Sequence, residues 1–320
     1  MKMWEEAPKT EIFGLQVYSF GLYCAAGVLC AVVAVCLLCR TERLKKGTGA
    51  LLSCLSILCG MICSRLTFCL LGGIESGMLP PAFWINITTG GWSLYGMIFG
   101  VFAGAWISSR ILGEKSTVLL DIVSCSIPLA MAAERFGEKG FDLFDISRTL
   151  PEYGFPRNTF LAVQDPYYSD VAYMATYLAA AIASMVLFLI LVFFLTRRRR
   201  DGDLWILFLI LCGAGGILLE SLRYDHFLEF SFVRFQQVLA AILFVWGSVL
   251  AVIRYGRTKT GLKLFFAFFL TAAIGACIAI EFALDRTDLS HYFLYLVMTA
   301  VLIVPAISGI LLLTKQEKTA

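Results

Sequence analysis

The sequence predicts an all-α, polytopic bundle of about nine transmembrane helices, with the N-terminus outside the cytoplasm and the C-terminus inside. Composition is the first observation behind this prediction: of 320 residues, 59% are hydrophobic and only 15% are charged, with a mean hydropathy of +0.82. Soluble domains carry about 25% charged residues and could not bury this much apolar surface. The other two observations are the long apolar runs and the distribution of basic residues between them.

The apolar runs define the spans, because a helix needs roughly 20 residues to cross the hydrocarbon core of a bilayer. They are residues 18–39, 50–71, 93–109, 117–133, 171–195, 204–219, 235–253, 264–280 and 292–313. The first run lacks a basic n-region and is long enough to span, so we expect a retained helix rather than a cleaved signal peptide. The short run 117–133 contains Asp121 and Pro128, which neighbouring helices can accommodate.

Basic residues fall in every odd-numbered connection between the spans and in the C-terminal tail. They are Arg40, Arg43, Lys45 and Lys46; Arg110 and Lys115; Arg197, Arg198, Arg199 and Arg200; Arg254, Arg257, Lys259 and Lys263; and Lys315 and Lys318. The short even-numbered connections are not enriched in Lys or Arg. The positive-inside rule therefore places the odd-numbered connections in the cytoplasm. We interpret the 197–200 run as a stop-transfer signal, and a net charge of +3 predicts no nucleic-acid partner.

The fourth connection, residues 134–170, is a long outer loop with charges of both signs, aromatic residues and prolines. Connections of this length in compact proteins are typically functional or mobile. The eleven cysteines lie within or at the ends of apolar runs, where they act as small hydrophobic residues. No CxxC or Cys/His spacing points to zinc, and His226 and His291 are far apart, so we expect no metal and no cofactor.

Ionisable residues gather toward the outer ends of three spans. Arg65 lies about 22 Å along the second span from its cytoplasmic start, at 1.5 Å per residue. Glu134 and Arg135 end the fourth span, while Glu220 and Arg223 end the sixth. Each residue alone would be a helix-end charge or a structural ion pair. Three arginines from different spans at similar depth indicate instead an anion site suited to phosphate, with Glu220 orienting an arginine or acting as a base.

The chain resembles the prolipoprotein diacylglyceryl transferases over about residues 18–255, through a series of motifs in the family's order. The motifs are YSFGL (18–22), SRL (64–66), GGWSLYGMIFG (90–100), Asp121 and Pro128 followed by ERFG (134–137), GDL (202–204), ESLRYD (220–225) and RFQQ (234–237). On this resemblance, residues 1–257 are a transferase-like membrane domain with the outer loop 134–170. Residues 258–320 are two additional C-terminal transmembrane helices.

The resemblance implies an enzyme of the bacterial cytoplasmic membrane that moves a diacylglyceryl group from phosphatidylglycerol to the lipobox cysteine of a prolipoprotein. Its partners would be phosphatidylglycerol, the prolipoprotein signal peptide with its lipobox, and the lipid bilayer. The site residues expected from the resemblance and from the clustered charges fall into two groups. Catalytic roles fall to Arg135, Glu220, Tyr95 and Glu138, and phosphate binding falls to Arg65, Arg135 and Arg223.

Several positions depart from the family's pattern. Glu138 stands where the family has an asparagine, which replaces a hydrogen-bond donor with a carboxylate that repels phosphate, unless Glu138 pairs with Arg135 or acts as the base for the thiol. Phe20 replaces a tyrosine, Tyr95 falls at a position that is histidine in many members, and Gly216 replaces an arginine. These departures leave a second hypothesis open: a non-catalytic, lipid- or lipoprotein-binding membrane protein derived from the family.

Overall fold

Nine long helices form a bundle in this computed structural model, which describes residues 10–12, 15–76, 84–85, 90–140, 155–164, 172–197, 200–223, 229–255 and 260–314. The helices of the described part are α1 (Ser19–Thr41), α2 (Thr48–Ser76), α4 (Leu94–Leu112), α5 (Ser116–Gly137), α6 (Thr176–Leu195), α7 (Asp203–Ser221), α8 (Phe235–Tyr255), α9 (Thr260–Arg286) and α10 (His291–Thr314). Eight of them are long and apolar enough to cross a membrane, and the part of α10 with described side chains, His291–Ile307, is a shorter apolar helix. The all-α, polytopic bundle expected from the sequence is confirmed.

In the described part of the chain, three short antiparallel hairpins each lead into a helix. They are β1 (Thr10–Ile12) with β2 (Leu15–Val17) before α1, β3 (Ala162–Gln164) with β4 (Ala172–Met174) before α6, and β5 (Glu229–Phe230) with β6 (Val233–Arg234) before α8. The span expected at 171–195 therefore starts too early, because residues 172–174 are apolar but pair with β3. Most of the loop expected at 134–170 lies outside the described residues. Its first residues are helical, because α5 extends to Gly137 and a 3-10 turn (Glu138–Gly140) follows.

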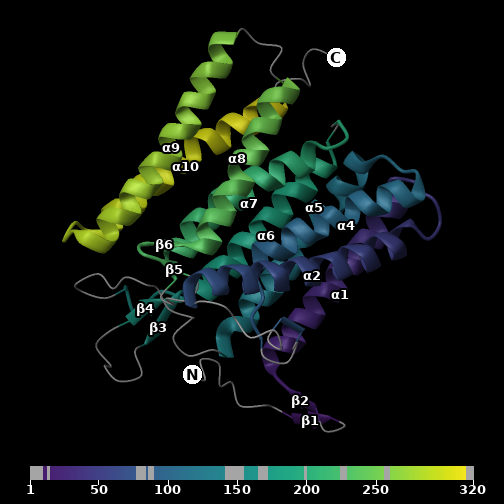
Figure 1. Ribbon diagram of the computed structural model, residues 1–320, viewed down its shortest axis with the longest axis horizontal. Helices are drawn as coiled ribbons and strands as arrows, with labels where there is room; N and C mark the ends of the chain where they lie inside the picture. The colour runs from purple at the N-terminus through teal and green to yellow at the C-terminus, as the bar shows by residue number, and fades with distance from the viewer. Residues whose placement is uncertain are drawn as a thin grey trace.

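The interior of the bundle is built around α7 and α5. Of the candidate spans, these two have the largest fractions of buried residues, 72% for α7 and 61% for α5. Helix α1 packs on α5, α2 packs on α4, and α8 packs on α7 (Figure 1). Helices α9 and α10 lie along the edge formed by α7 and α8, on the side away from α1 and α2 (Figure 1). Aromatic rings of α4, α7 and α8 fill the space between these helices, with Phe102 in edge contact with Trp205 and Phe208.

Helices α2 and α4 approach closely because glycines recur every fourth residue along one face of α4. A Cβ on Gly104 would lie 2.6 Å from both Leu55 O and Ser56 Cα of α2, and one on Gly100 would overlap the carbonyl of Cys59. Small residues at such spacing let helix backbones meet inside a membrane, where van der Waals contact drives association. The short apolar run expected at 93–109 thus forms a full membrane helix, Leu94–Leu112.

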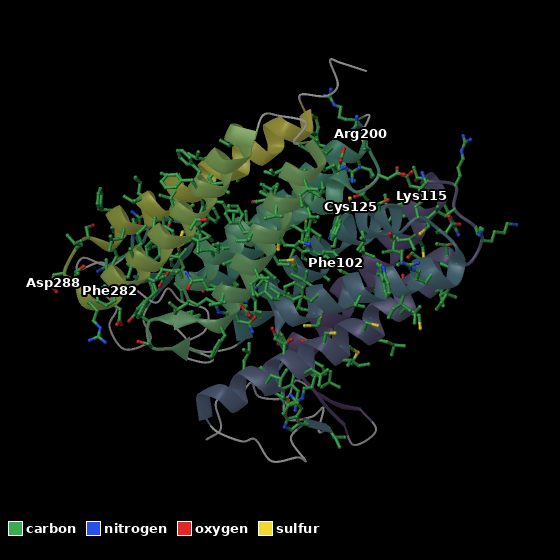
Figure 2. All side chains as sticks on the ribbon, turned by 45° about the horizontal axis from the view of Figure 1, so that its top comes forward. Phe102, Lys115, Cys125, Arg200, Phe282 and Asp288 are labelled. Atoms are coloured by element: carbon green, nitrogen blue, oxygen red, sulfur yellow. The ribbon has the colours of Figure 1, made fainter. Side chains whose placement is uncertain are left out.

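Described residues in or next to the four basic connections lie together at one end of the bundle, which we call the basic end (Lys45, Lys115, Asp201, Arg254). Lys45 Nζ donates to Leu112 O at 2.8 Å, and Lys115 Nζ lies 3.0 Å from Asp201 Oδ2. Arg254 Nε lies 3.3 Å from Asp203 Oδ1. Figure 2 shows Lys115 and Arg200 at this end, and Asp288 and Phe282 at the opposite one. The grouping agrees with the pattern that predicts a cytoplasmic face; which side of the membrane it occupies stays a prediction.

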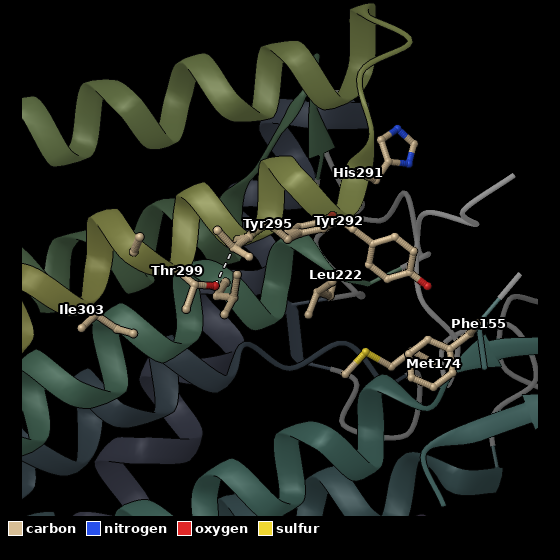
Figure 3. A pocket seen from close by; sticks show the side chains of 11 residues that line it. Phe155, Met174, Leu222, His291, Tyr292, Tyr295, Thr299 and Ile303 are labelled. Atoms are coloured by element: carbon tan, nitrogen blue, oxygen red, sulfur yellow. Dashed lines mark hydrogen bonds between the residues drawn. The ribbon is translucent and has the colours of Figure 1, made fainter. Parts of the chain in front are cut away.

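The outer surface of the bundle presents large apolar side chains. Along α1, Leu22, Leu29, Val33 and Leu37 are each about half exposed or more. A contiguous apolar surface of this kind needs a partner, and lipid supplies it for membrane helices. A groove of about 550 Å³ interrupts this surface between α10, the end of α7 and the β3–β4 hairpin (Figure 3). Its lining is mainly apolar, with Leu218 and Leu222 on one side and Leu296 and Ile303 on the other.

Candidate functional site

The polar cluster that we consider the site lies at the end of the bundle opposite the basic end. Arg135 comes from the last turn of α5, Glu138 from the 3-10 turn that follows, and Glu220 from the last turn of α7. Arg223 follows α7 directly. Helix α5 starts at the basic end and spans 22 residues, about 33 Å at 1.5 Å per residue, so its last turn reaches the far side of a hydrocarbon core.

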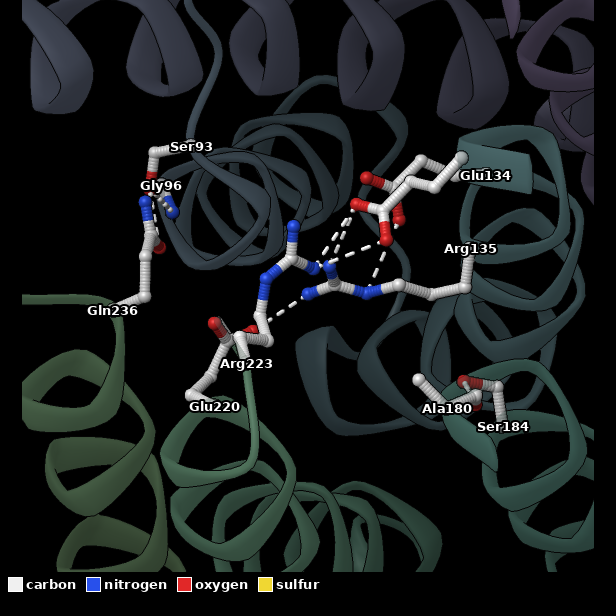
Figure 4. A network of polar contacts seen from close by, with 10 residues as sticks. Ser93, Gly96, Glu134, Arg135, Ala180, Ser184, Glu220, Arg223 and Gln236 are labelled. Carbon is white, nitrogen blue, oxygen red and sulfur yellow. Dashed lines mark hydrogen bonds and ion pairs between the residues drawn. The ribbon is translucent and has the colours of Figure 1, made fainter. Parts of the chain in front are cut away.

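Arg135 forms the centre of the cluster, as Figure 4 shows. Its Nη2 donates to Glu220 Oε1 at 2.6 Å and its Nη1 donates to Glu138 Oε1 at 2.9 Å. Its Nε also lies 3.5 Å from Glu134 Oε2, an ion pair without hydrogen-bond geometry. The side chain is 7% exposed. A charge this buried needs partners, and the charge-assisted bonds to two carboxylates from separate helical segments supply them.

Glu138 bridges the two arginines. Its Oε2 accepts from Arg223 Nη1 at 3.0 Å, and its Oε1 accepts from both Arg223 and Arg135, at 3.1 and 2.9 Å. Glu138 is 6% exposed. A carboxylate held between two guanidinium groups occupies the kind of position that a phosphate oxygen pair would take. In the structure as it stands, the anion of the site is a side chain of the protein itself.

The cluster is an extended ion-pair network. Three carboxylates (Glu134, Glu138 and Glu220) pair with Arg135, Glu138 also pairs with Arg223, and Arg234 Nη2 donates to Arg223 O. Removing one partner from such a buried network leaves an uncompensated charge and is strongly destabilising, by about 3–5 kcal/mol in measured cases. Glu138 is the carboxylate that occupies donors of both Arg135 and Arg223.

Arg65 contacts a different part of this face. Its Nη1 donates to the carbonyls of Gly90 and Gly91, the latter at 2.8 Å, and its guanidinium lies 5.7 Å from the centre of the Trp92 ring. The expected convergence of three arginines is thus shown for Arg135 and Arg223, which share Glu138. Arg65 instead anchors the segment that enters α4.

Tyr95 lies beneath the last turns of α7. It is 2% exposed, and a Cβ on Gly216 would overlap its Oη and lie 2.9 Å from Ala240 Cβ. Gly216 is one helical turn before Glu220. The tyrosine therefore fills the space that a side chain at position 216 would need. The two departures noted at these positions belong together, because the larger residue at 95 requires the absence of a side chain at 216.

The start of α4 is tied to the start of α8 next to these residues. Ser93 Oγ accepts from Gly96 N at 3.1 Å as the N-cap of α4 and donates to Gln236 Oε1 at 3.0 Å. Ser64 Oγ donates to Ser93 O at 2.8 Å, which fixes the same segment to α2. The family-like motif GGWSLYG is therefore in direct contact with both SRL and RFQQ in the folded chain. Tyr224 and Asp225 of the ESLRYD motif lie outside the described residues.

Two further carboxylates belong near the site without a site role assigned to them from the sequence. Glu134 is half-buried and joins the cluster through Arg135. Glu281 lies just past the end of the span expected at 264–280. Helix α9 continues to Arg286, and Glu281 is 1% exposed. Its signal in the sequence is a single carboxylate at the end of an apolar run, which looks the same as an exposed helix-end charge.

Comparison with known proteins identifies the family. The family model described as prolipoprotein diacylglyceryl transferase matches residues 9–253. The chain is 28% identical over 207 residues to the phosphatidylglycerol–prolipoprotein diacylglyceryl transferase of Fervidobacterium nodosum. The aligned residues cover 63% of this chain and 69% of that protein. Its identity to the protein of the same name from Bacillus velezensis is 25% over 249 residues, with 75% and 89% covered. For Thermotoga maritima it is 27% over 172 residues, so the aligned part spans about half of each chain, 51% and 56%. The family match extends over most of the chain and includes every residue of the Arg135 cluster, and the chain belongs to the prolipoprotein diacylglyceryl transferase family.

Proposed function

We propose that this protein transfers a diacylglyceryl group from phosphatidylglycerol to the lipobox cysteine thiol of a prolipoprotein, in the cytoplasmic membrane of a bacterium. The buried cluster of Arg135, Glu138, Glu220 and Arg223 supports the proposal best, because it gathers two guanidinium groups and two carboxylates at one end of a membrane helix bundle. The proposed substrates come from the family membership and from the names of the related proteins. The transferase-like part would be residues 1–257, with residues 258–320 as two added helices.

The proposed reaction forms a bond between the thiol sulfur and the glyceryl carbon of the lipid and breaks the bond between that carbon and a phosphate oxygen. Arg135 and Arg223 bind the phosphate and offset the charge that develops on the leaving glycerol phosphate. Glu220 orients Arg135 through the 2.6 Å hydrogen bond and takes the thiol proton, which then neutralises the departing phosphate oxygen. The sulfur electron pair forms the new bond, and the electrons of the broken bond leave with the phosphate.

The other assigned residues support this chemistry. Glu138 pairs with the two arginines while no lipid is bound, and the lipid phosphate replaces its carboxylate when the lipid enters. Tyr95 supports the last turns of α7 by packing against Gly216. Arg65 fixes the Gly90–Gly91 segment through its hydrogen bond to Gly91 O. We therefore assign phosphate binding mainly to Arg135 and Arg223.

The test supplies purified protein with labelled phosphatidylglycerol and a lipobox peptide and measures thioether product. Arg135→Ala and Glu220→Ala are each expected to lower the rate by at least about a hundredfold, since each removes a charge that acts in the transition state. Arg110→Ala is the matched control: it removes a guanidinium that stacks on Trp106 at 5.1 Å, near the basic end, and should transfer at the normal rate. If the wild-type protein makes no product while a Bacillus velezensis relative does, the transferase proposal is refuted for this substrate, and the hypothesis of a non-catalytic, lipid- or lipoprotein-binding protein takes its place.

A further inference from the structure

Helices α9 and α10 lie beyond the matched residues 9–253, yet both make polar contacts with the part of the bundle that carries the site. Two added helices in a membrane protein could simply serve as further anchors, in which case their faces toward the bundle would be apolar. Their buried residues are mostly apolar, but two polar side chains are among the residues that contact the bundle, Glu281 from α9 and Tyr295 from α10. Both contacts lead to the last turn of α7, which contains Glu220.

Glu281 reaches α7 through Gln237. Gln237 Nε2 donates to Glu281 Oε1 at 2.8 Å and to the carbonyl of Ile217 at 3.1 Å. Both partners are oxygen acceptors, so the NH2 group of the amide must face them. Glu281 is 1% exposed and Gln237 is 5% exposed. A buried carboxylate in a membrane helix is costly unless it is paired, so its presence calls for a specific role.

Tyr295 reaches α7 directly. Its hydroxyl donates to the carbonyl of Ser221 at 3.1 Å, and Ser221 Oγ donates back to it at 3.4 Å (Figure 3 shows Tyr295 beside Leu222). Ser221 is the last residue of α7, and the last four carbonyls of a helix have no intrahelical partner. Tyr295 thus caps the C-terminus of α7 from another helix.

These contacts hold the backbone of α7 at residues 217 and 221, one on each side of Glu220. Both are bonds to main-chain carbonyls, so they fix the position and rotation of the last turn rather than of one side chain. The turn sets where Glu220 meets Arg135 and where Arg223 meets Glu138. A shift of about 1 Å at such a position is enough to lower a catalysed rate by about a hundredfold.

We propose that the C-terminal helix pair is a functional part of the site: Glu281, acting through Gln237, and Tyr295 are positioning residues that hold the last turn of α7 in register with Arg135. The inference rests on the proposed function for its effect on rate, and on the geometry alone for its effect on α7. The second effect can be measured whether or not the protein transfers a lipid.

The first experiment measures hydrogen exchange of peptides that cover residues 217–223 in full-length protein. Tyr295→Phe and Glu281→Leu are each expected to raise the exchange rate there by about fivefold, the equivalent of a net hydrogen bond of about 1 kcal/mol. Glu281→Gln keeps an acceptor for Gln237 and should exchange like wild type. Thr299→Val is the matched control, because the Thr299 hydroxyl donates to Tyr295 O within α10 at 2.7 Å. Unchanged exchange in Tyr295→Phe and Glu281→Leu overturns the inference, whatever the activity.

The second experiment measures kcat and KM for thioether formation in the same variants. Positioning predicts that Tyr295→Phe and Glu281→Leu lower kcat by about three- to tenfold with KM nearly constant, and that Glu281→Gln restores kcat. If the two variants exchange faster but kcat is unaltered, the contacts of Glu281 and Tyr295 with α7 serve stability only, and the positioning role is refuted. If both variants exchange faster but the wild-type protein makes no thioether, the proposed transferase function is refuted, while the hold of Glu281 and Tyr295 on the last turn of α7 is established.

Discussion

At the scale of single residues, the unusual feature of the site is the carboxylate of Glu138, which lies between two guanidinium groups. It accepts hydrogen bonds from Arg135 and Arg223 in a region that is almost fully buried. Hydrogen bonds to charged groups are worth about 1.5–3 kcal/mol each. Under the proposed function these bonds are exchanged for bonds to the lipid phosphate, so Glu138 would weaken the binding of an anionic headgroup.

We expect Glu138→Gln to bind phosphatidylglycerol more tightly than wild type, by on the order of tenfold, because the amide keeps the size of the side chain and removes the competing charge. Titration of the purified protein with the lipid, followed by native mass spectrometry, measures this. Glu114→Gln is the control, since Glu114 lies near Lys45 at the basic end. Weaker binding in Glu138→Gln would mean that the carboxylate organises the arginines rather than competing for them.

Tyr95 and Gly216 form a coupled pair. Gly216→Ala should destabilise the protein by about 1–3 kcal/mol, because the new methyl group would overlap Tyr95 Oη in a packed interior. Tyr95→Phe removes that oxygen, so the double variant should recover part of the loss, and a double-mutant cycle in denaturant would show the coupling. Gly215→Ala is the control, since no atom lies within 4 Å of its added Cβ. Additive losses in the cycle would refute the coupling.

At the scale of elements, Asp121 explains how α5 and α7 are joined. It lies inside a span, where a charge is costly, and its carboxylate accepts from the backbone N–H groups of Gly202 and Trp205 at 2.7 and 2.9 Å. These are donors at the start of α7, which lack partners within the helix and carry its positive dipole. The residue acts as the N-cap of a helix that is 81 positions away from it along the chain.

Asp121→Ala should therefore lower the free energy of unfolding by at least about 2 kcal/mol, since it leaves two buried N–H groups unsatisfied. Denaturation in mixed micelles followed by circular dichroism gives this value. Ser126→Ala on the same helix serves for comparison, because the Ser126 hydroxyl donates only to Val123 O, within α5. An equal loss in the two variants would show that the cap contributes nothing specific.

Hydropathy predicted the helices well because the requirement for about 20 apolar residues acts on each span by itself. It placed the start of α6 at 171 rather than Thr176, since the apolar residues of β4 carry no mark of their pairing with β3. For the site, it predicted that Arg135 and Glu220 lie at the same end. It could not predict the bridging by Glu138 or the contacts of Glu281, because these join segments whose relative rotation is set only by packing in the folded bundle.

At the scale of the whole molecule, the alternation of the helices fixes which connections share a side. The connections that contain Lys45, Lys115 and Asp201 are joined by hydrogen bonds or ion pairs at one end, and Asp288 lies at the other end (Figure 2). The positive-inside rule then assigns the basic end to the cytoplasm. This assignment places the Arg135 cluster at the outer leaflet, where an exported prolipoprotein would meet it.

A protease recognition sequence inserted into the full-length chain tests this assignment. Inserted after Asp288, in the exposed connection between α9 and α10, it should be cut when protease is added to intact spheroplasts. Inserted after Lys46, in the exposed connection between α1 and α2, it should be cut only after lysis. Both sites lie in connections outside the Arg135 cluster, so transfer activity reports whether each variant has folded. The reverse pattern of cleavage would put the cluster on the cytoplasmic side, where no exported thiol is available, and the proposed reaction could not run there.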